Sequence, residues 1–211
     1  MHAQHLRRHS PAAERNGPPI LSHLQQLLPA RGLMLEIASG TGQHAAHLSA
    51  GLPGWHWQPT DFNAESLPSI RAWCAGMARV RPPLQLDVLA QPWPHELPNP
   101  VDAIFCANMI HIAPWDCTPA LMRGAARHLA PQGLLITYGP YLEDDVRTSP
   151  GNISFDADLR ARDPAWGLRP LAAVASQAQA AGLRLRERIA MPANNLLLVW
   201  ARTISDADAT D

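Results

Sequence analysis

The sequence predicts an α/β fold with a mostly parallel seven-stranded sheet, a C-terminal antiparallel hairpin, and helices on both faces. Two observations lead to this prediction. Apolar, strand-like runs alternate with segments of helical periodicity over most of the chain, which is typical of a parallel sheet covered by helices. The last two apolar runs, 183–191 and 195–202, are separated by too few residues for a parallel crossover, so they must form an antiparallel hairpin.

Each element before the hairpin has its own sequence features. A first helix is expected from about Asn16, its cap, because Pro18 and Pro19 suit a first turn and Ile20 begins a series of apolar residues at helical spacing. Five parallel strands are expected at 32–38, 56–61, 84–88, 102–110 and 134–140. Helices are expected between them at 42–52, 64–76 and 118–133, the last capped by Thr118.

The length of 211 residues fits one domain, expected at 1–204, with a disordered acidic tail at 205–211. Within the domain, 1–30 is predicted to be a cap segment and helix. The long polar segment 142–170 is predicted to be a lid over a substrate site, because long irregular segments in compact domains tend to be functional. The sequence shows no apolar run of membrane-spanning length and no secretory signal, so a cytoplasmic location is expected.

Composition excludes several kinds of chemistry. All 17 basic residues are arginine, so Schiff-base and P-loop lysine chemistry are ruled out. The net charge of −1 provides no overall field for nucleic acid, and we expect neither a nucleic-acid nor a membrane partner. Three cysteines without a CxxC spacing are expected to be free core thiols. His44 and His47 have a metal-compatible spacing but no third ligand nearby, so no metal site is expected.

The segment "LMLEIASGTGQHAAHL" places a glycine turn directly after an apolar strand. A dinucleotide fingerprint would need a third glycine where Ala45 stands, although alanine is tolerated there, so a nicotinamide cofactor stays open. The turn also fits E-x-A-x-G-x-G, formed by Glu36, Ala38, Gly40 and Gly42. A carboxylate beside this turn would repel a pyrophosphate and attract the cationic groups of S-adenosylmethionine.

Two further acids follow the second and third predicted strands. Asp61 lies at the distance along the chain where an acid can bind ribose hydroxyls, which would serve either cofactor. Asp87 precedes Val88 and can accept a hydrogen bond from an adenine amino group. The alternative for Glu36, Asp61 and Asp87 is that each acid only caps the helix that follows.

Several blocks together identify a resemblance to a known family. The blocks are "SPAAERN", "EIASGTGQHA", "NMIHIAPW", "YGPY", "FDADLRARDPAWGLR" and "MPANNLLLVW". The chain resembles the methyltransferase-like protein 26 family, within the class I S-adenosylmethionine-dependent methyltransferases. The resemblance implies a single Rossmann-like domain, no established substrate, and cofactor residues at Glu36, Gly40, Thr41, Gly42, Asp61 and Asp87.

The reacting groups are expected beyond the ends of the first and fourth strands. His111 is the candidate general base, because imidazole titrates near neutral pH, although a histidine that only bonds a neighbouring loop is the alternative. Tyr138 and Tyr141 are the other catalytic candidates. His44 and Asn108 join Ala38 and Val88 as further cofactor contacts.

The predicted substrate contacts come from the N-terminal segment, the end of the fourth strand and the lid. Arg169 would clamp an acidic acceptor, and Trp166 would supply an apolar wall. The full set is Arg15, Asn16, Trp115, Asn152, Trp166 and Arg169. Capping of the first helix is the alternative for Arg15 and Asn16, and a helix-surface ion-pair set is the alternative for Asp156, Arg160 and Asp163.

Three functions are therefore considered. The leading one is S-adenosylmethionine-dependent methyl transfer to a small-molecule acceptor by in-line displacement, in which positioning supplies much of the rate. The second is a protein that binds S-adenosylmethionine without turnover. The third is a nicotinamide-dependent reductase, which Glu36 and the terminal hairpin disfavour.

Overall fold

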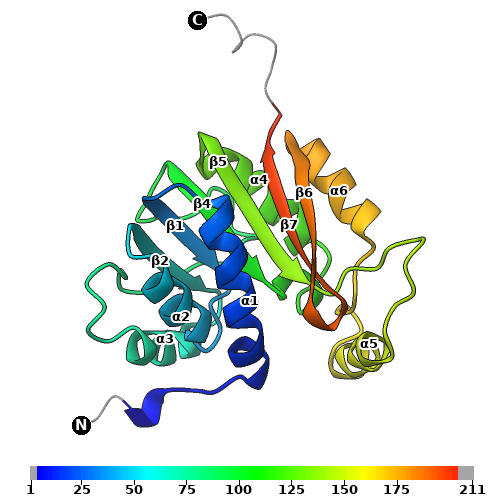
Figure 1. Cartoon of the computed structure of the whole chain (residues 1–211), viewed down its shortest axis with the longest axis horizontal. Helices are drawn as coiled ribbons and strands as arrows, with labels where there is room; N and C mark the ends of the chain where they lie inside the picture. Colours follow the sequence, from blue (N-terminus) through cyan, green and yellow to red (C-terminus); the bar gives the residue numbers. More distant parts are fainter. Residues whose placement is uncertain (1–3, 204–211) are drawn as a thin grey trace, which may run out of the picture.

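A computed structural model describes residues 4–203, which form a seven-stranded sheet between two layers of helices (Figure 1). The strand order is β3-β2-β1-β4-β5-β7-β6. The first five strands are parallel, and β7 pairs antiparallel with both β5 and β6. The predicted fold class is confirmed, and the predicted tail at 205–211 lies outside the described residues. The strands are β1 (Gly32–Ile37), β2 (Trp55–Asp61), β3 (Leu84–Gln85), β4 (Val101–Ala107), β5 (Leu129–Gly139), β6 (Leu183–Met191) and β7 (Asn195–Arg202).

Helices cover both faces of the sheet, as the alternation of elements predicted. On one face α1, α2 and α3 pack on a core around Met34, Phe105 and Ile136. On the other face α4 and α6 pack on a core around Leu35, Ile104 and Trp200. The α-helices are α1 (Pro11–Leu27), α2 (Gln43–Gly51), α3 (Leu67–Trp73), α4 (Cys117–His128), α5 (Pro150–Arg162) and α6 (Leu171–Ala180). Short 3-10 turns are η1 (Gln4–Leu6), η2 (Ala64–Ser66), η3 (Met109–His111) and η4 (Pro192–Asn194).

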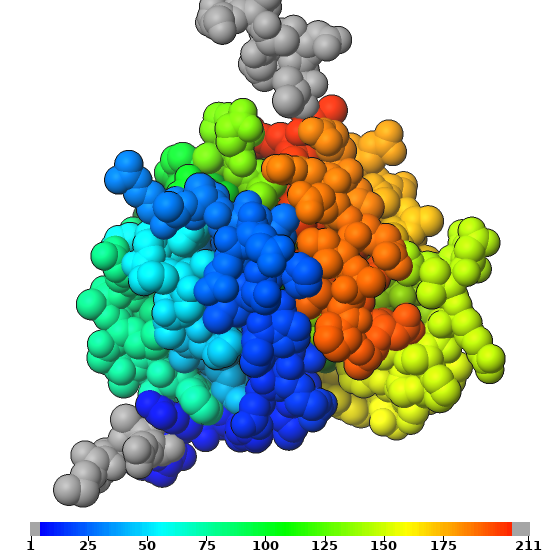
Figure 2. Space-filling model, in the orientation of Figure 1, coloured from blue at the N-terminus to red at the C-terminus, as the bar shows by residue number. Residues whose placement is uncertain are grey.

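The start of α1 differs from the prediction. The helix begins at Pro11, and Ser10 is its cap, with the Ser10 hydroxyl accepting from the Ala13 amide at 3.3 Å. The cap expected at Asn16 is therefore wrong, and the two prolines expected in the first turn lie inside the helix. The physical reason is that Ser10 followed by Pro11 satisfies the rule for a cap and first helical position six residues earlier. Figure 2 shows α1 running across the middle of the face of the molecule in view, between α2 and β6.

Other boundaries shift where local backbone conformation ends an element. Strand β4 stops at Ala107 because Asn108 is left-handed, with φ of 62°, and leads into η3. Helix α4 stops at His128, and β5 starts five residues earlier than expected, since Pro131 cannot continue a helix. Thr118 is not the cap of α4: it lies inside the helix, and its hydroxyl is buried without a partner among the described residues.

The hairpin and the cysteines agree with expectation. β6 and β7 match the predicted ranges, and Cys74, Cys106 and Cys117 are free and buried. No helix within residues 4–203 is long and apolar enough to cross a membrane. Helix α6 was not predicted, and α5 makes part of the supposedly irregular segment 142–170 helical. Helix α5 lies beyond the carboxyl end of β5, beside the hairpin turn (Figure 1).

Gly124 tests the packing of α4. A Cβ atom built there would stand 2.0 Å from Cζ2 of the buried Trp93 ring. We expect Gly124→Ala to lower the free energy of unfolding by about 1–3 kcal/mol through overpacking. Gly151→Ala in α5 is the matched control, because its Cβ meets nothing within 4 Å. It should change stability by less than about 1 kcal/mol in chemical denaturation, and equal losses at both positions would contradict this packing.

Candidate functional site

A cavity of about 490 Å³ lies at the carboxyl edge of the sheet, where β1, β2, β3 and β4 end. Its walls are mostly apolar, with two carboxylates among them. The lining residues are Ile37, Ala38, Gly40, Asp61, Phe62, Leu86, Asp87, Val88, Leu89, Ala107, Met109, Ile112, Ala113, Pro114, Cys117 and Trp166. A second hollow of about 530 Å³ lies between the end of α3 and the loop before β3, and none of the strand-end acids lines it. The first cavity is the one at the predicted position.

The loop after β1 forms one wall and has an unusual backbone. Ala38, Gly40 and Gly42 all have positive φ, of 56°, 58° and 90°. A Cβ at Gly42 would stand 2.6 Å from the Ile70 Cα, so glycine is required there for α2 to approach α3. Three loop amides are already bonded: Ser39 to the Thr60 carbonyl at 2.8 Å, Gly40 to an Asp61 carboxylate oxygen at 2.8 Å, and Gly42 to the Ser39 carbonyl at 2.9 Å.

The two strand-end acids lie in the cavity wall, as predicted. Asp61 is buried, and its second carboxylate oxygen accepts from the Asn63 amide at 3.0 Å. Asp87 is exposed, and one of its oxygens accepts from the Leu89 amide at 2.9 Å. Both acids therefore organise their own turns while facing the cavity. Neither caps a helix, contrary to the alternative, because Asn63 caps η2 and no helix within residues 4–203 follows Asp87 directly. Val88 follows Asp87 in the same wall.

Glu36 is not among the lining residues, although it lies near the carboxyl end of β1. Its carboxylate is 2% exposed and accepts from the Trp57 indole N–H at 2.7 Å. Burial raises its pKa to about 7, against the opposing effect of hydrogen bonds from Trp57 and Ser39. This acid therefore stands behind the loop rather than in contact with the cavity.

Four other predicted cofactor residues also lie outside the lining. Thr41 and Gly42 shape the loop. His44 is buried against the Phe105 ring at 6.0 Å, and burial lowers its pKa to about 4. Asn108 follows β4, and its amide donates to the Tyr138 carbonyl at 2.7 Å. Within residues 4–203 no group of three His, Cys, Asp or Glu side chains is arranged to hold a metal.

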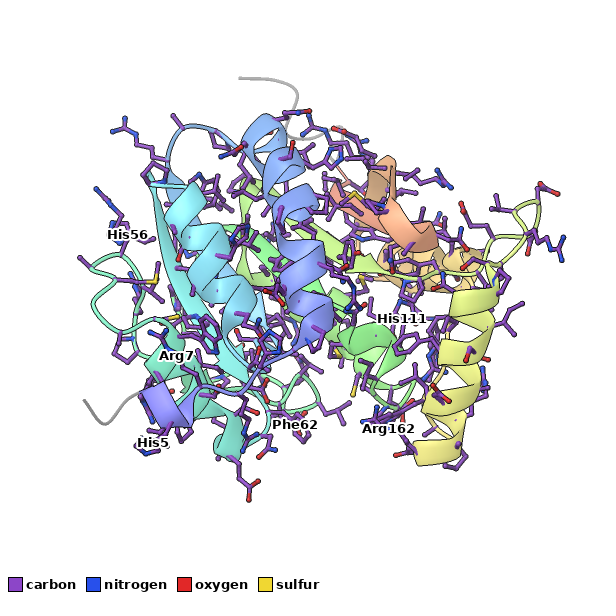
Figure 3. All side chains as sticks on the ribbon, turned by 60° about the horizontal axis from the view of Figure 1, so that its bottom comes forward. His5, Arg7, His56, Phe62, His111 and Arg162 are labelled. Carbon is purple, nitrogen blue, oxygen red and sulfur yellow. The ribbon has the colours of Figure 1, made fainter. Side chains whose placement is uncertain are left out.

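His111 is enclosed rather than facing the cavity. Its side chain is 0% exposed, and burial lowers its pKa to about 3. The ring contacts Tyr141 edge-on at 4.7 Å, and neither ring nitrogen has a partner among the described residues. Figure 3 places His111 between the β4 end and α5. The imidazole is neutral at neutral pH but is a weak base in this environment.

The two tyrosines lie on opposite faces of the sheet. Tyr141 donates its hydroxyl to Thr137 Oγ1 at 2.8 Å and is part of the α4 side core. Tyr138 lies under α1, with its hydroxyl buried and without a partner in the described part of the chain. Burial raises the Tyr138 pKa to about 12, and the nearby Arg15 guanidinium opposes that rise. Arg15 is exposed, Asn16 is half-buried, and neither lines the cavity.

One predicted lid residue reaches the cavity. Trp166 lines it, and the Arg162 guanidinium lies 5.0 Å from the Trp166 ring centroid. Arg169 instead donates to three carbonyls: Ile110 at 3.3 Å, Ala113 at 2.9 Å and Ala165 at 2.5 Å. Its guanidinium also lies 5.7 Å from the Trp115 ring. Arg169 thus joins the lid to the segment after β4 through its Nε and Nη2 donors.

Asn152 and the lid ion pairs have local roles. Asn152 Nδ2 donates to the Asn194 carbonyl at 2.9 Å, which links α5 to the hairpin turn. Asp156 and Arg160 form the expected i, i+4 pair at 2.9 Å. Asp163 is not part of that pair: one of its carboxylate oxygens accepts from the Ala165 amide at 2.8 Å.

Sequence reasoning missed most of the apolar wall. Phe62 is 67% exposed and Leu89 is 47% exposed, so both form an open rim. Figure 3 shows Phe62 at this edge, between the N-terminal segment and α5. Phe62 and Met109 directly follow the predicted site residues Asp61 and Asn108. Their positions just after the ends of strands were therefore the sequence signal that could have identified them as part of the site.

The raised pKa of Glu36 predicts a pH-dependent stability. The folded protein holds this proton more tightly than the unfolded chain, so the contribution is greatest below pH 4.5 and falls as the pH rises to about 7. As the pH rises from 5 to 8, the free energy of unfolding of Glu36→Gln should increase relative to that of the wild type by up to about 3 kcal/mol. Denaturation measured at a series of pH values checks this. The exposed Glu96→Gln is the control. A difference that does not vary with pH would contradict the assignment.

Three solved structures with a similar fold are methyltransferases. Human N-acetylserotonin methyltransferase in complex with SAM has a TM-score of 0.74 and 16% identity over 90% of this chain. The SAH-bound form of CalO1, a methyltransferase in calicheamicin biosynthesis, has a TM-score of 0.72 and 18% identity over 90% of this chain. An O-methyltransferase family 2 protein from Planctomyces limnophilus, in complex with apigenin, has a TM-score of 0.74 and 20% identity over 90%. The chain spans 52%, 54% and 58% of those proteins' lengths, respectively.

The sequence also matches a family model over almost its whole length. The model, described as "Protein of unknown function (DUF938)", covers residues 7–202. This range includes every strand, the glycine loop and both strand-end acids. The chain therefore belongs to the DUF938 family and has the fold of the class I methyltransferases.

Proposed function

We propose that the protein binds S-adenosylmethionine in the carboxyl-edge cavity and transfers its methyl group to a small-molecule acceptor. The observation that carries the proposal is the pairing of the left-handed loop at Ala38–Gly42 with carboxylates at Asp61 and Asp87 in one apolar cavity. The solved relatives include SAM- and SAH-bound methyltransferases. The quoted sequence blocks support the narrower proposal of kinship with the methyltransferase-like protein 26 family. A cytoplasmic location stays a prediction.

The chemistry of the cavity wall fits this ligand. Asp61 and Asp87 offer carboxylates to ribose hydroxyls and an adenine amino group, while Phe62 and Val88 offer apolar contact to a flat base. Among the described residues no arginine or histidine lines the cavity, so the wall favours a cationic ligand over a polyanion. S-adenosylmethionine supplies a methyl group on a sulfonium, which is already activated for displacement.

The same observations count against a nicotinamide cofactor. A pyrophosphate needs free backbone amides at the glycine turn. Dinucleotide-binding sites present such amides at the N-terminus of the helix that follows the turn. Here the Ser39, Gly40 and Gly42 amides are bonded within the protein, and the Asp61 carboxylate stands directly at the turn. A phosphate there would lose hydrogen-bond donors and meet a like charge.

We assign different roles to the predicted residues. Asp61, Asp87, Val88, Ala38 and Gly40 would contact the ligand. Glu36, Thr41, Gly42 and His44 would support the loop and its surroundings, and Asn108 would shape the end of β4.

Methyl transfer to the acceptor would depend on positioning the acceptor more than on removing a proton from it. His111 is enclosed and weakly basic, and the Tyr141 hydroxyl is occupied by Thr137. Tyr138 keeps an unused hydroxyl near Arg15, and Trp166 supplies an apolar wall from the lid. We therefore propose Trp166 as the acceptor contact. Tyr138 is as enclosed as His111, and Arg15, Asn16 and Trp115 do not line the cavity, so they are assigned to the surroundings of the site. Arg169 and Asn152 would hold the lid in place.

Asp61 provides the direct test. We expect Asp61→Asn to weaken S-adenosylhomocysteine binding at least about 10-fold in calorimetry, because a charged hydrogen-bond acceptor is lost from both loop and ligand. Asp102→Asn is the matched control: an Asp102 carboxylate oxygen accepts from the Leu33 amide at 2.7 Å, at the opposite end of β1. Its affinity should stay within about twofold of the wild type. Failure of the wild type to bind, or a preference for NADH, would reject the proposed cofactor.

A turnover assay distinguishes an enzyme from a protein that only binds S-adenosylmethionine. Incubation with S-adenosylmethionine and a small-molecule library should yield S-adenosylhomocysteine together with a methylated acceptor. Tight binding with no product from any acceptor would favour the non-catalytic alternative.

A further inference from the structure

The N-terminal strap, residues Arg7–Ser10, is docked on α3 beside the glycine loop. Arg7 Nε donates to the Ala72 carbonyl at 2.9 Å, and its guanidinium lies 5.0 Å from the Trp73 ring centroid. The Trp73 indole N–H donates to the Arg8 carbonyl at 2.9 Å. Figure 3 shows Arg7 against α3, at the same edge as Phe62. The strap therefore has a fixed position on α3.

Two hydrogen-bond relays run from the strap to one loop residue, Thr41. In the first, Gln43 Oε1 accepts from the Ser10 amide at 2.5 Å and from the Thr41 hydroxyl at 3.1 Å. In the second, the Ser69 hydroxyl accepts from the Arg8 amide at 2.9 Å and donates to the Thr41 carbonyl at 2.7 Å. Gln43 is 8% exposed and Ser69 is 1% exposed, so water competes little for these bonds.

The loop needs support from this side. Its backbone is left-handed at Ala38, Gly40 and Gly42, which costs free energy at a non-glycine residue such as Ala38. From the β2 side, the Thr60 carbonyl and the Asp61 carboxylate hold the amides of Ser39 and Gly40. Thr41 is instead held by the two relays, so the loop is fixed between β2 and the strap.

We propose that Gln43 and Ser69 are positioning residues, through which the strap holds the glycine loop in the shape that receives the amino-acid end of the ligand. The inference rests on the proposed function and deepens it. The two strand-end acids serve the nucleoside end and do not take part in either relay. The strap thus selects ligands that carry the amino-acid end.

Two ligands separate this role from a general effect on folding. S-adenosylhomocysteine carries the amino-acid end, whereas 5′-methylthioadenosine has the same nucleoside without it. We expect Gln43→Leu and Ser69→Ala each to weaken S-adenosylhomocysteine binding about 3- to 10-fold, the effect of one hydrogen bond. Binding of 5′-methylthioadenosine should change less than about twofold.

The controls remove similar side chains away from the loop. Gln25→Leu removes the 3.0 Å bond that Gln25 donates to the Gly51 carbonyl, and Ser49→Ala removes a buried hydroxyl that donates to the Ala45 carbonyl. Both controls should leave the ratio of the two affinities unchanged. In the ligand-free protein, hydrogen exchange at residues 38–42 should speed up in the relay variants only.

The possible outcomes are distinct. If the wild type binds S-adenosylhomocysteine but the relay variants lose both ligands equally, or lose neither, the positioning role is overturned. If the wild type binds neither ligand, the proposed function itself fails, and with it the ligand selectivity inferred for the strap. Thermal unfolding of every variant shows whether a lost affinity merely follows lost stability.

Discussion

The hydrogen bond from the Gly40 amide to the Asp61 carboxylate connects the ends of β1 and β2, and the site depends on it. It holds a left-handed residue of the loop against an acid that is itself fixed by the Asn63 amide. The bond therefore sets the backbone shape of the loop and the position of a charged acceptor in the cavity wall at once. Neither feature would be defined without the other, because a free carboxylate would turn to water and a free loop would sample other conformations.

This arrangement gives the cavity wall a negative charge. Loop amides that would otherwise attract an anion are bonded to oxygens of Thr60, Asp61 and Ser39. What remains for a ligand is an apolar wall with two carboxylates. The same glycine-rich turn that serves phosphates in other α/β proteins is thus suited here to an uncharged nucleoside joined to a cationic group.

Two segments far apart in the sequence enclose this edge of the sheet. The N-terminal strap reaches the loop through Gln43 and Ser69, and the lid reaches the cavity through Trp166. Arg169 holds the lid by donating to the Ala113 carbonyl, which follows η3. Asn152 holds it by donating to the Asn194 carbonyl in the hairpin turn. Much of the polar character of these segments therefore serves to fix their position, and comparatively little of it is left for a substrate.

Periodicity, glycine placement and the short hairpin connection determined the fold class and the location of the site. These are local or nearest-neighbour properties, and they led correctly to the five parallel strands, the hairpin, and the acids Asp61 and Asp87 at one edge. Only the tertiary structure decided which side chains face the cavity. Glu36 turns to Trp57, His111 is enclosed beside Tyr141, and Arg169 is used by three carbonyls, because each partner comes from a segment distant in the chain. The apolar wall and the relays to Thr41 were hidden for the same reason: a leucine, a glutamine or a serine has no distinctive spacing until the packing of the strands and helices supplies its neighbours.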